Sequence, residues 1–419
     1  MTLRYSQFAA TVGYETAFNV LAVARTLKAA GKRVIELEIG DSPFPSTAAG
    51  RQAGISAIES GQTHYCPSAG LPELRAAAAA YVNREHRLSV TGANVVVAPG
   101  AKPFELFFCE AFLDTGDGVL IFSPYFPTYL PNIARRGARA MLAPLRQEHG
   151  FRPEMEQVRR FLELDPRPRA IFLNSPHNPT GGVTTADDLR ELADLIRGSD
   201  VMVFSDEPYD QMVWQGRHHS LLEQPGMLEH CVAAYTFSKS YSMSGWRLGF
   251  AVAHSEVIDI MARLLNTSLS CVPPFVQLAG AAALEHDQAE RDETMQRFRG
   301  KVELLAAGLN QIEGVRCLEP AATFYVFPSV KPICNRLGIT SHGLAMYLLE
   351  GADDHLGVAC LGGECFGAAG GGFIRFSCAE PDDALREALA FFPQAVARTD
   401  RVQRFLTARP QYRLEKPYE

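Results

Sequence analysis

The chain has 419 residues, 47% of them hydrophobic and 21% charged, a composition typical of a globular protein long enough for two domains. Its formal net charge is −7 and it has no run of lysine or arginine, so we do not expect nucleic acid as a partner. No apolar run approaches the roughly 18 residues of a membrane span, and the first residues lack the apolar centre of a signal peptide, which predicts a cytoplasmic protein without a membrane partner.

The cysteines and histidines do not favour a metal site. Nine cysteines are scattered along the chain without a Cys-x-x-Cys pair, which argues against a disulfide framework and against zinc. His218 and His219 are adjacent rather than four residues apart, and we interpret them as part of a solvated turn. We therefore predict no metal.

Short apolar strands alternate with helical patterns through the first half of the chain. The alternation predicts a mostly parallel sheet covered by helices on both faces, and ligands in such sheets bind beyond the carboxyl ends of the strands. The expected strands are 34–39, 95–98, 118–122, 138–142, 170–173 and 201–204. The expected helices are 17–28, 72–81, 104–112, 128–136, 153–162 and one from a capping box at Thr185 to Gly198.

The remainder of the chain predicts a smaller α+β domain. Residues 275–309 are expected to form one long connecting helix, and the tail 398–419 is expected at the surface. The later strands are expected at 314–318, 323–327, 357–361 and 373–376, with helices at 341–349 and 381–392. The predicted division is an N-terminal arm with part of the small domain over 1–45, a large domain over 46–295 and a small C-terminal domain over 296–419.

A glycine turn between the strand 95–98 and the next helix forms a candidate anion site. The first amides of a helix are unpaired and its dipole is positive at that end, so Gly100, Ala101 and Lys102 could surround an anion. Lys102 lies where the dipole disfavours a cation, which also indicates a nearby anion. The alternative is a lysine in solvent on the turn.

The segment 235–250 places Lys239 among hydroxyl side chains. A lysine amine forms Schiff bases with carbonyl compounds, while the hydroxyls of Thr236 and Ser238 and the planar cation of Arg247 suit a phosphate. An aldehyde together with a phosphate describes pyridoxal phosphate. The alternative is a polar loop between two strands.

Two further loops carry candidate ligands. Asp206 follows the strand 201–204, and an acid in so apolar a site needs a partner that stays cationic, such as a pyridinium nitrogen. A helix cap is the alternative for Asp206. Gly40 follows the strand 34–39 and leaves its backbone free to approach a ligand, although it could be an ordinary turn residue.

Four motifs in this order resemble the class I/II aminotransferases of fold type I, over nearly the whole chain. The resemblance implies a large domain with a seven-stranded, mostly parallel sheet, a smaller α+β domain and pyridoxal 5′-phosphate as the cofactor. The motifs are Asn174-x-Pro176-x-Asn178-Pro179-Thr180-Gly181, Ser205-Asp206-Glu207-x-Tyr209, Ser238-Lys239 with Gly245-Trp246-Arg247-Leu248-Gly249, and Phe373-Ile374-Arg375-Phe376-Ser377.

The resemblance also implies residue roles around the cofactor ring. Lys239 would be the Schiff-base lysine and would shuttle the proton between substrate and cofactor. Asp206 would keep the pyridine nitrogen protonated, and Tyr209 and Asn178 would hydrogen-bond the phenolic oxygen. Phe126 would stack on the ring, with Tyr125 as the second choice.

The remaining roles concern the phosphate, the substrate and a second subunit. By the same resemblance, Arg375 would clamp the substrate α-carboxylate, helped by Gly40 and Asn178. Tyr65 would reach the phosphate from the other subunit of a homodimer. The phosphate would also be held by Thr236, Ser238, Arg247 and the amides of Gly100, Ala101 and Lys102.

The sequence departs from the family pattern in two places that concern the substrate. The usual Pro-Gly after the late strand is replaced by Leu361-Gly362-Gly363-Glu364-Cys365 and a glycine-rich stretch over 367–372. The opening Gly40-Asp41-Ser42-Pro43-Phe44 lacks the commonest acid–proline order. Both leave the identity of the substrate open.

The predicted function is a pyridoxal-phosphate-dependent aminotransferase that acts on an α-amino acid and a 2-oxo acid. Lys102 suggests a dicarboxylic couple, glutamate/2-oxoglutarate or aspartate, because it could meet a distal carboxylate. The alternative is a lyase on the same fold, either a carbon–sulfur β-lyase or an aminocyclopropane-carboxylate-synthase-like enzyme. A non-catalytic transcription regulator would need a helix-turn-helix segment, for which the stretch before Ala17 is too short.

Overall fold

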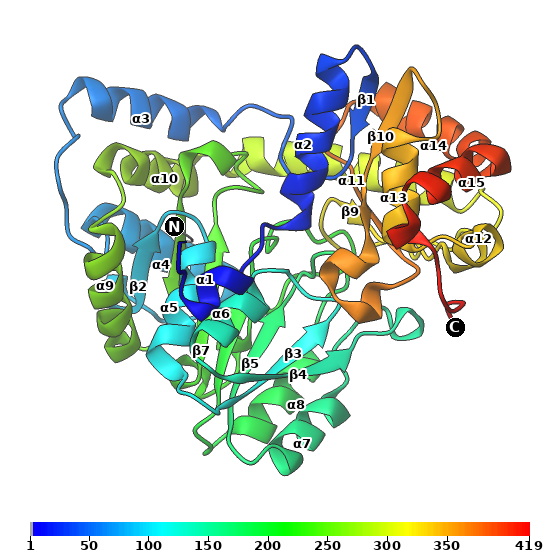
Figure 1. The fold of residues 1–419 in the computed structure, drawn as a ribbon. Coiled ribbons are helices and arrows are strands. Elements are labelled where there is room, and N and C mark those ends of the chain that lie inside the picture. The colour runs from blue at the N-terminus through cyan, green and yellow to red at the C-terminus, as the bar shows by residue number, and fades with distance from the viewer. Residues whose placement is uncertain (1–2) are drawn as a thin grey trace.

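A seven-stranded sheet lies at the centre of the larger part of the molecule (Figure 1), a computed structural model that describes residues 3–419. Strand β8 is antiparallel to both of its neighbours, β2 and β7, whereas the other pairs in the sheet are parallel. In spatial order the strands are β2 (Val95–Ala98), β8 (Gly249–Val252), β7 (Cys231–Thr236), β6 (Met202–Asp206), β5 (Pro168–Asn174), β3 (Gly118–Ser123) and β4 (Arg139–Pro144). The predicted fold class is confirmed.

Helices cover both faces of this sheet because alternate strand residues point to opposite sides. Phe172 and Phe204 pack on one face with residues of α5 (Lys102–Phe112), α6 (Tyr129–Arg135) and α9 (Ser255–Leu269). Ile171 and Val203 pack on the other face with α4 (Pro72–His86), α7 (Met155–Leu164), α8 (Ala186–Ile196) and α10 (Pro274–His286). Of the helices within residues 3–419, none is both long enough and apolar enough to cross a membrane.

The smaller part of the molecule is built from the N-terminal segment and the last third of the chain, which lie side by side as the blue and orange ribbons of Figure 1. Strand β1 (Arg33–Glu36) pairs in parallel with β10 (Leu356–Ala359), and β12 (Ile374–Ser377) lies between β11 (Leu361–Gly362) and β9 (Tyr325–Val326). The helices here are α2 (Thr16–Ala29), α12 (Lys331–Leu337), α13 (Ser341–Glu350), α14 (Asp382–Ala397) and α15 (Thr399–Ala408). The domain boundaries at 45/46 and 295/296 stay predictions.

The single helix predicted over 275–309 is wrong, because the chain forms two helices, α10 and α11 (Gln288–Leu309), separated at Asp287. The buried carboxylate of Asp287 accepts hydrogen bonds from the amides of Ala49 and Gly50, each at 2.9 Å. These amides open α3 (Ala48–Glu59), which the sequence did not predict, as it did not predict the short α1 (Gln7–Thr11) or α12. Asp287 thus supplies the acceptor that free amides at a helix start require.

Two expectations for the C-terminal third are also wrong. The tail is not only surface, because α15 buries Val402, Phe405 and Leu406 along one side, and the Phe405 ring lies 5.6 Å from that of Tyr347. The strand expected over 314–318 is reduced to one isolated bridge at Arg316. Apolar residues at helical spacing explain the first error, since their burial stabilises a helix that charged neighbours obscure in the sequence.

Candidate active site

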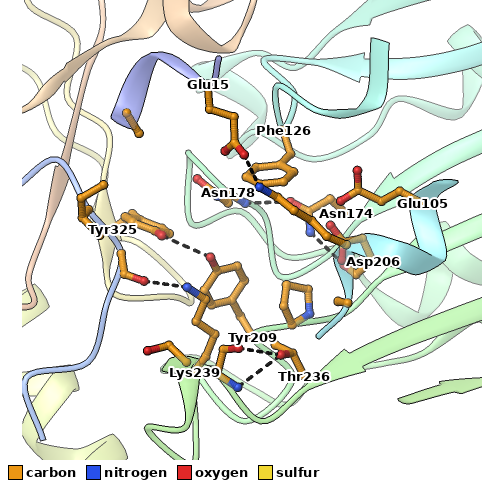
Figure 2. Close-up of a pocket in the computed structure, with 18 of the residues that line it drawn as sticks. Glu15, Glu105, Phe126, Asn174, Asn178, Asp206, Tyr209, Thr236, Lys239 and Tyr325 are labelled. Carbon is orange, nitrogen blue, oxygen red and sulfur yellow. Dashed lines mark hydrogen bonds and ion pairs between the residues drawn. The ribbon is translucent and has the colours of Figure 1, made fainter. Parts of the chain in front are cut away.

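A cavity of about 470 Å³ lies beyond the carboxyl ends of β5, β6 and β7, where loops of the smaller part close over the sheet (Figure 2). All the predicted site residues line it except Gly100 and Tyr65. These lining residues are Gly40, Ala101, Lys102, Phe126, Asn178, Asp206, Tyr209, Thr236, Ser238, Lys239, Arg247 and Arg375. The parallel strands bring these residues together because their carboxyl ends share one edge of the sheet.

Lys239 follows β7 and extends into the middle of the cavity. Its Nζ donates a hydrogen bond to the carbonyl oxygen of Gly40 at 2.6 Å and lies 5.5 and 5.7 Å from the ring centres of Phe324 and Tyr209. A Cβ on Gly40 would come within 1.7 Å of the Tyr325 hydroxyl, so only glycine fits at this position. The lysine amine therefore has one polar partner in a largely aromatic environment.

Asp206 ends β6 at the floor of the cavity. The Tyr129 hydroxyl donates a hydrogen bond to its Oδ2 at 2.6 Å. Burial raises the pKa of Asp206 to about 6, although the Tyr129 hydrogen bond and the positive charges of Lys239 and Lys102 lower it in part. An acid in this state is suited to a cationic ligand that would restore its ionised form.

Two asparagines connect Asp206 to Arg375. Asn174 donates from Nδ2 to the backbone oxygen of Asp206 at 2.8 Å and accepts from the amide of Asn178 at 2.9 Å. The Asn178 side-chain oxygen accepts in turn from the Arg375 guanidinium at 3.0 Å. Arg375 also donates to the backbone oxygen of Glu38, and its Nε is buried without a hydrogen-bond partner among residues 3–419. The motif around Asn174 thus fixes a buried guanidinium at the cavity wall.

The opposite end of the cavity holds the predicted phosphate ligands. Thr236 donates a hydrogen bond to the Ser238 hydroxyl at 2.9 Å, and Arg247 donates to the backbone oxygens of Ser244 at 2.9 Å and Pro99 at 3.2 Å. Gly100 has φ +88°, and a Cβ there would lie 2.7 Å from the Arg247 guanidinium. Gly100 therefore lets the guanidinium pack against the turn at the start of α5, although it does not line the cavity itself.

Of the two candidate stacking residues, only Phe126 lines the cavity. The backbone amide of Tyr125 bonds the oxygen of Phe366 at 2.9 Å, and a Cβ on Gly367 would come within 2.5 Å of the Tyr125 ring. Tyr125 therefore packs against the glycine-rich stretch, and the geometry favours Phe126.

Tyr65 does not reach the cavity of its own chain, because its side chain is 90% exposed. Other large apolar side chains are exposed near it in sequence on α3, namely Ile55 at 44% and Ile58 at 51%. The expected contribution of Tyr65 to a partner subunit's site stays a prediction.

Several lining residues were missed by the sequence reasoning. Tyr325 accepts a hydrogen bond from the Tyr209 hydroxyl at 3.2 Å, and Glu15 and Glu105 also face the cavity. Tyr325 falls in the predicted strand 323–327, whose alternation places it on one face but does not show that this face covers β6. Glu15 precedes the predicted helix 17–28, and nothing in the sequence around it indicated that it lines the cavity.

The solvated turn expected at His218 is wrong. His218 is buried and its Nε2 lies 2.7 Å from a carboxylate oxygen of Glu207, which also accepts bonds from Ser205, Ser220 and Tyr235. Burial opposes ionisation of Glu207, but His218 and then His86 hold its pKa below the usual value. His86, Glu207 and His218 lie close enough together to hold a metal ion, yet these hydrogen bonds already occupy both Glu207 oxygens. The group therefore acts as a structural network.

Glu38 should make the stability of the protein depend on pH. It is fully buried, neither carboxylate oxygen has a hydrogen-bond partner among residues 3–419, and burial raises its pKa to about 7. The folded state then disfavours the ionised form, so the penalty is absent below pH ~4.5, grows as the pH rises and is complete above ~7. We expect Glu38→Gln to raise the free energy of unfolding by up to about 3 kcal/mol at pH 8 and by little at pH 4.5.

Urea unfolding of both proteins at the two pH values measures this difference. Glu36→Gln is the matched control, because Glu36 is only partly buried and pairs with Lys28 at 2.8 Å. An equal change for Glu38→Gln at both pH values would show that Glu38 ionisation does not limit stability.

Comparisons with known proteins agree with this geometry. The sequence model of the family "Aminotransferase class I and II" matches residues 32–392. An aspartate aminotransferase of Pyrococcus abyssi is 33% identical over 85% of this chain and 90% of its own, and an aspartate/prephenate aminotransferase of Thermus thermophilus is 34% identical over 90% and 95%. The structure of Thermus thermophilus aspartate aminotransferase with maleate superimposes with a TM-score of 0.87 at 32% identity, covering 94% of this chain and 100% of that one.

The sheet and the cavity define a fold type I enzyme that uses pyridoxal phosphate. The chain belongs to the family of class I and II aminotransferases. It is a pyridoxal-phosphate-dependent transaminase, which confirms the predicted family, activity and cofactor. The relatives named above are aminotransferases, so the lyase alternative is not favoured.

The residues present fit this cofactor. At one end of the cavity buried Asp206 accepts a hydrogen bond from Tyr129 and forms no ion pair within residues 3–419, and at the other the hydroxyls, Arg247 and the start of α5 present donors to an anion. Lys239 lies in the same cavity. A molecule with a basic ring nitrogen, a phosphate and an aldehyde matches all three features. When bound, pyridoxal phosphate supplies an aldehyde that condenses with amines and a ring that withdraws electrons.

Proposed function

We propose that this transaminase uses a dicarboxylic couple, glutamate/2-oxoglutarate or aspartate with its 2-oxo acid, as one of its two substrate pairs. Lys102 carries the proposal, because its ammonium lines the cavity separately from Arg375 and lies 5.3 Å from the centre of the Phe126 ring. Lys239 and Arg247 also line the cavity but are assigned to the cofactor, so Lys102 and Arg375 are the two cations left among residues 3–419 for two substrate carboxylates. Relatives named aspartate aminotransferases support the same choice.

Residues at the floor and the far end of the cavity would hold the cofactor. Asp206 would pair with the ring nitrogen, Tyr209 and Asn178 would bond the phenolic oxygen, and Phe126 would pack on the ring. The phosphate would be bound by Thr236, Ser238, Arg247 and the amides of Gly100, Ala101 and Lys102. The support for these roles is that most of these residues line one cavity and that burial raises the pKa of Asp206, a shift that a cationic ring nitrogen would offset.

Lys239 and Arg375 would act on the substrate. Arg375 would bind the α-carboxylate through its guanidinium, with Asn178 and the loop of Gly40 beside it. This would hold the substrate α-carbon near the Lys239 amine. The Lys239 amine would hold the cofactor through its aldehyde, and once the substrate is bound it would take the proton from that carbon as a general base and return it as a general acid. The aromatic walls of Tyr209, Phe324 and Tyr325 limit the access of water to this proton.

A screen of half-reactions tests the substrate proposal. Cofactor-loaded enzyme is mixed with single amino acids, and the change of its visible absorbance is followed. We expect glutamate or aspartate to react, and Lys102→Ala to lower kcat/KM for that amino acid by about tenfold or more, as for a lost hydrogen bond to a charged group, without a similar loss for alanine.

Lys28→Ala is the control, because Lys28 lies away from the cavity and pairs with Glu36. If both dicarboxylic amino acids are inert while neutral or aromatic ones react, or if Lys102→Ala leaves kcat/KM for glutamate and aspartate unchanged, the proposed couple is wrong.

We also propose a homodimer in which Tyr65 reaches the phosphate of the partner subunit. The 90% exposure of Tyr65 and the exposed apolar side chains on α3 support it, because such groups favour a covered surface. Light scattering should give twice the mass of the chain, and Tyr65→Phe should weaken cofactor binding. A monomer that keeps full activity at micromolar concentration would contradict the proposal.

The other partner and location predictions stay as the sequence suggested them. We expect small-molecule amino acids and 2-oxo acids as ligands, no nucleic acid or membrane partner, and the cytoplasm as the location.

A further inference from the structure

The ammonium of Lys102 is already paired within the chain. Glu15, the residue before α2, forms a salt bridge from its Oε1 to the Lys102 Nζ, and both residues line the cavity. The side chain of Glu15 is 17% exposed and that of Lys102 is 42% exposed. Figure 2 shows Glu15 entering the cavity above Phe126, on the side away from Lys239 and Thr236.

The other acids near Lys102 are committed elsewhere. Glu105 lies one turn along α5, but it is fully buried and accepts from the Thr128 hydroxyl at 2.5 Å. Burial, and then the nearby charge of Asp206, raise the pKa of Glu105 well above its usual value, which makes it a weaker counter-ion than Glu15. Asp206 accepts from Tyr129 at the floor of the cavity. Glu15 is therefore the carboxylate that balances the charge of Lys102.

We propose that Glu15 is a specificity-determining residue, an internal counter-ion of Lys102 that a dicarboxylic substrate displaces and that stays in place for a substrate with an uncharged side chain. This rests on the proposed role of Lys102 as the partner of a distal carboxylate. The Glu15 carboxylate has the chemistry of the group it competes with. A transaminase must accept two different substrates in one cavity, and a removable counter-ion lets the same lysine face either a carboxylate or a neutral side chain.

The local structure permits such a displacement. The Glu15 side chain makes no capping hydrogen bond to α2, although it occupies the N-cap position. The residues just before it are largely exposed, Val12 by 47% and Tyr14 by 88%. Glu15 can therefore turn toward solvent without breaking a helix cap, and an exposed carboxylate is readily hydrated.

Binding of succinate and butyrate to the cofactor-loaded enzyme, measured by calorimetry, tests the proposal. Both are unreactive because they lack an amino group, and butyrate lacks only the second carboxylate. We expect Glu15→Gln to bind succinate at least about threefold more tightly than the parent, since an exposed ion pair no longer competes. Butyrate affinity should change by less than about twofold. In turnover, kcat/KM for glutamate should rise relative to that for alanine.

Asp41→Asn is the matched control, because Asp41 is an exposed acid next to the lining residue Gly40 and accepts a hydrogen bond from Ser244, not from Lys102. It should leave succinate affinity unchanged. In the Lys102→Ala background, Glu15→Gln should not increase succinate affinity. This result distinguishes competition for Lys102 from a general effect of removing a negative charge. Melting temperatures of all variants establish that they are folded.

Two results would overturn the inference about Glu15. One is unchanged or weaker succinate binding in Glu15→Gln while Lys102→Ala weakens it, which would leave the role of Lys102 intact. The other is an equal increase in succinate affinity from Glu15→Gln in the parent and in the Lys102→Ala background. If instead Lys102→Ala leaves succinate binding unchanged, the proposed function of Lys102 fails, and the inference fails with it.

Discussion

Lys239→Ala is expected to abolish the visible absorbance of the purified enzyme and to lower kcat by at least ~10³-fold, the scale of a lost general base. In the proposed roles, the amine of Lys239 bonds the cofactor aldehyde and moves the substrate proton. Its position, 2.6 Å from the carbonyl oxygen of Gly40 and beside the rings of Tyr209 and Phe324, leaves it directed into the cavity. Absorbance spectra and steady-state kinetics measure the two effects.

Borohydride reduction followed by peptide mapping provides the decisive readout. In the parent the cofactor should be found on the peptide that contains Lys239, and in Lys239→Ala it should be absent. Lys28→Ala should behave as the parent, because Lys28 is engaged with Glu36 outside the cavity. The same labelled peptide in Lys239→Ala would disprove the assignment.

Asp206→Asn should lower kcat by about 10² or more, the lower range for a missing proton-transfer or electrostatic group. The amide can still accept the hydrogen bond from Tyr129, so the geometry of the floor is retained while the charge is lost. A neutral amide does not hold a proton on the ring nitrogen, and the ring then withdraws electrons less strongly. Single-turnover kinetics with the amino acid substrate measure this loss.

Removal of the cofactor should reverse the effect of Asp206→Asn on stability. Without a cationic partner, burial raises the pKa of Asp206 to about 6, so the folded state loses stability as the pH rises from about 4 through 6. Cofactor-free Asp206→Asn should therefore be more stable than the cofactor-free parent by up to about 3 kcal/mol at pH 8, and equal to it near pH 4. With cofactor, the parent should gain more stability than the variant.

Denaturant unfolding with and without cofactor measures both differences. Asp41→Asn serves as the control for loss of one exposed acid beside the cavity, and it should show neither difference. A cofactor-free Asp206→Asn variant that is less stable than the parent at pH 8 would show that the carboxylate is not strained by its burial.

The sequence predicted five of the seven strands of the central sheet, but not β7 or β8, and the expected strand 34–39 pairs with β10 in the smaller part instead. The strand at Val95–Ala98 and the capping box at Thr185 were predicted because their signals are local, an apolar run in one case and a side chain three residues from its amide in the other. Asp206 could be placed at this edge because it follows a predicted strand of a parallel sheet, and such strands end at one edge. Lys239 was placed beside it only by the family resemblance, because β7 was not predicted.

Other features depend on contacts between residues far apart in the chain. The break at Asp287 serves amides at Ala49 and Gly50, and the burial of His218 depends on Glu207 behind the sheet. The residues around Asp287 have the pattern of a helix interior, and those around His218 have the pattern of a polar turn. The sequence therefore favoured the wrong environment for both.

The same limit applies to substrate selection. The Tyr209 hydroxyl meets Tyr325 across 116 residues, and Lys102 meets Glu15 across 87. Local spacing determines backbone hydrogen bonds and which face of an element is apolar, but it does not determine which loops close over that face. Packing of α2 against β1, β10 and β11 of the smaller part decided that the carboxylate of Glu15 faces Lys102.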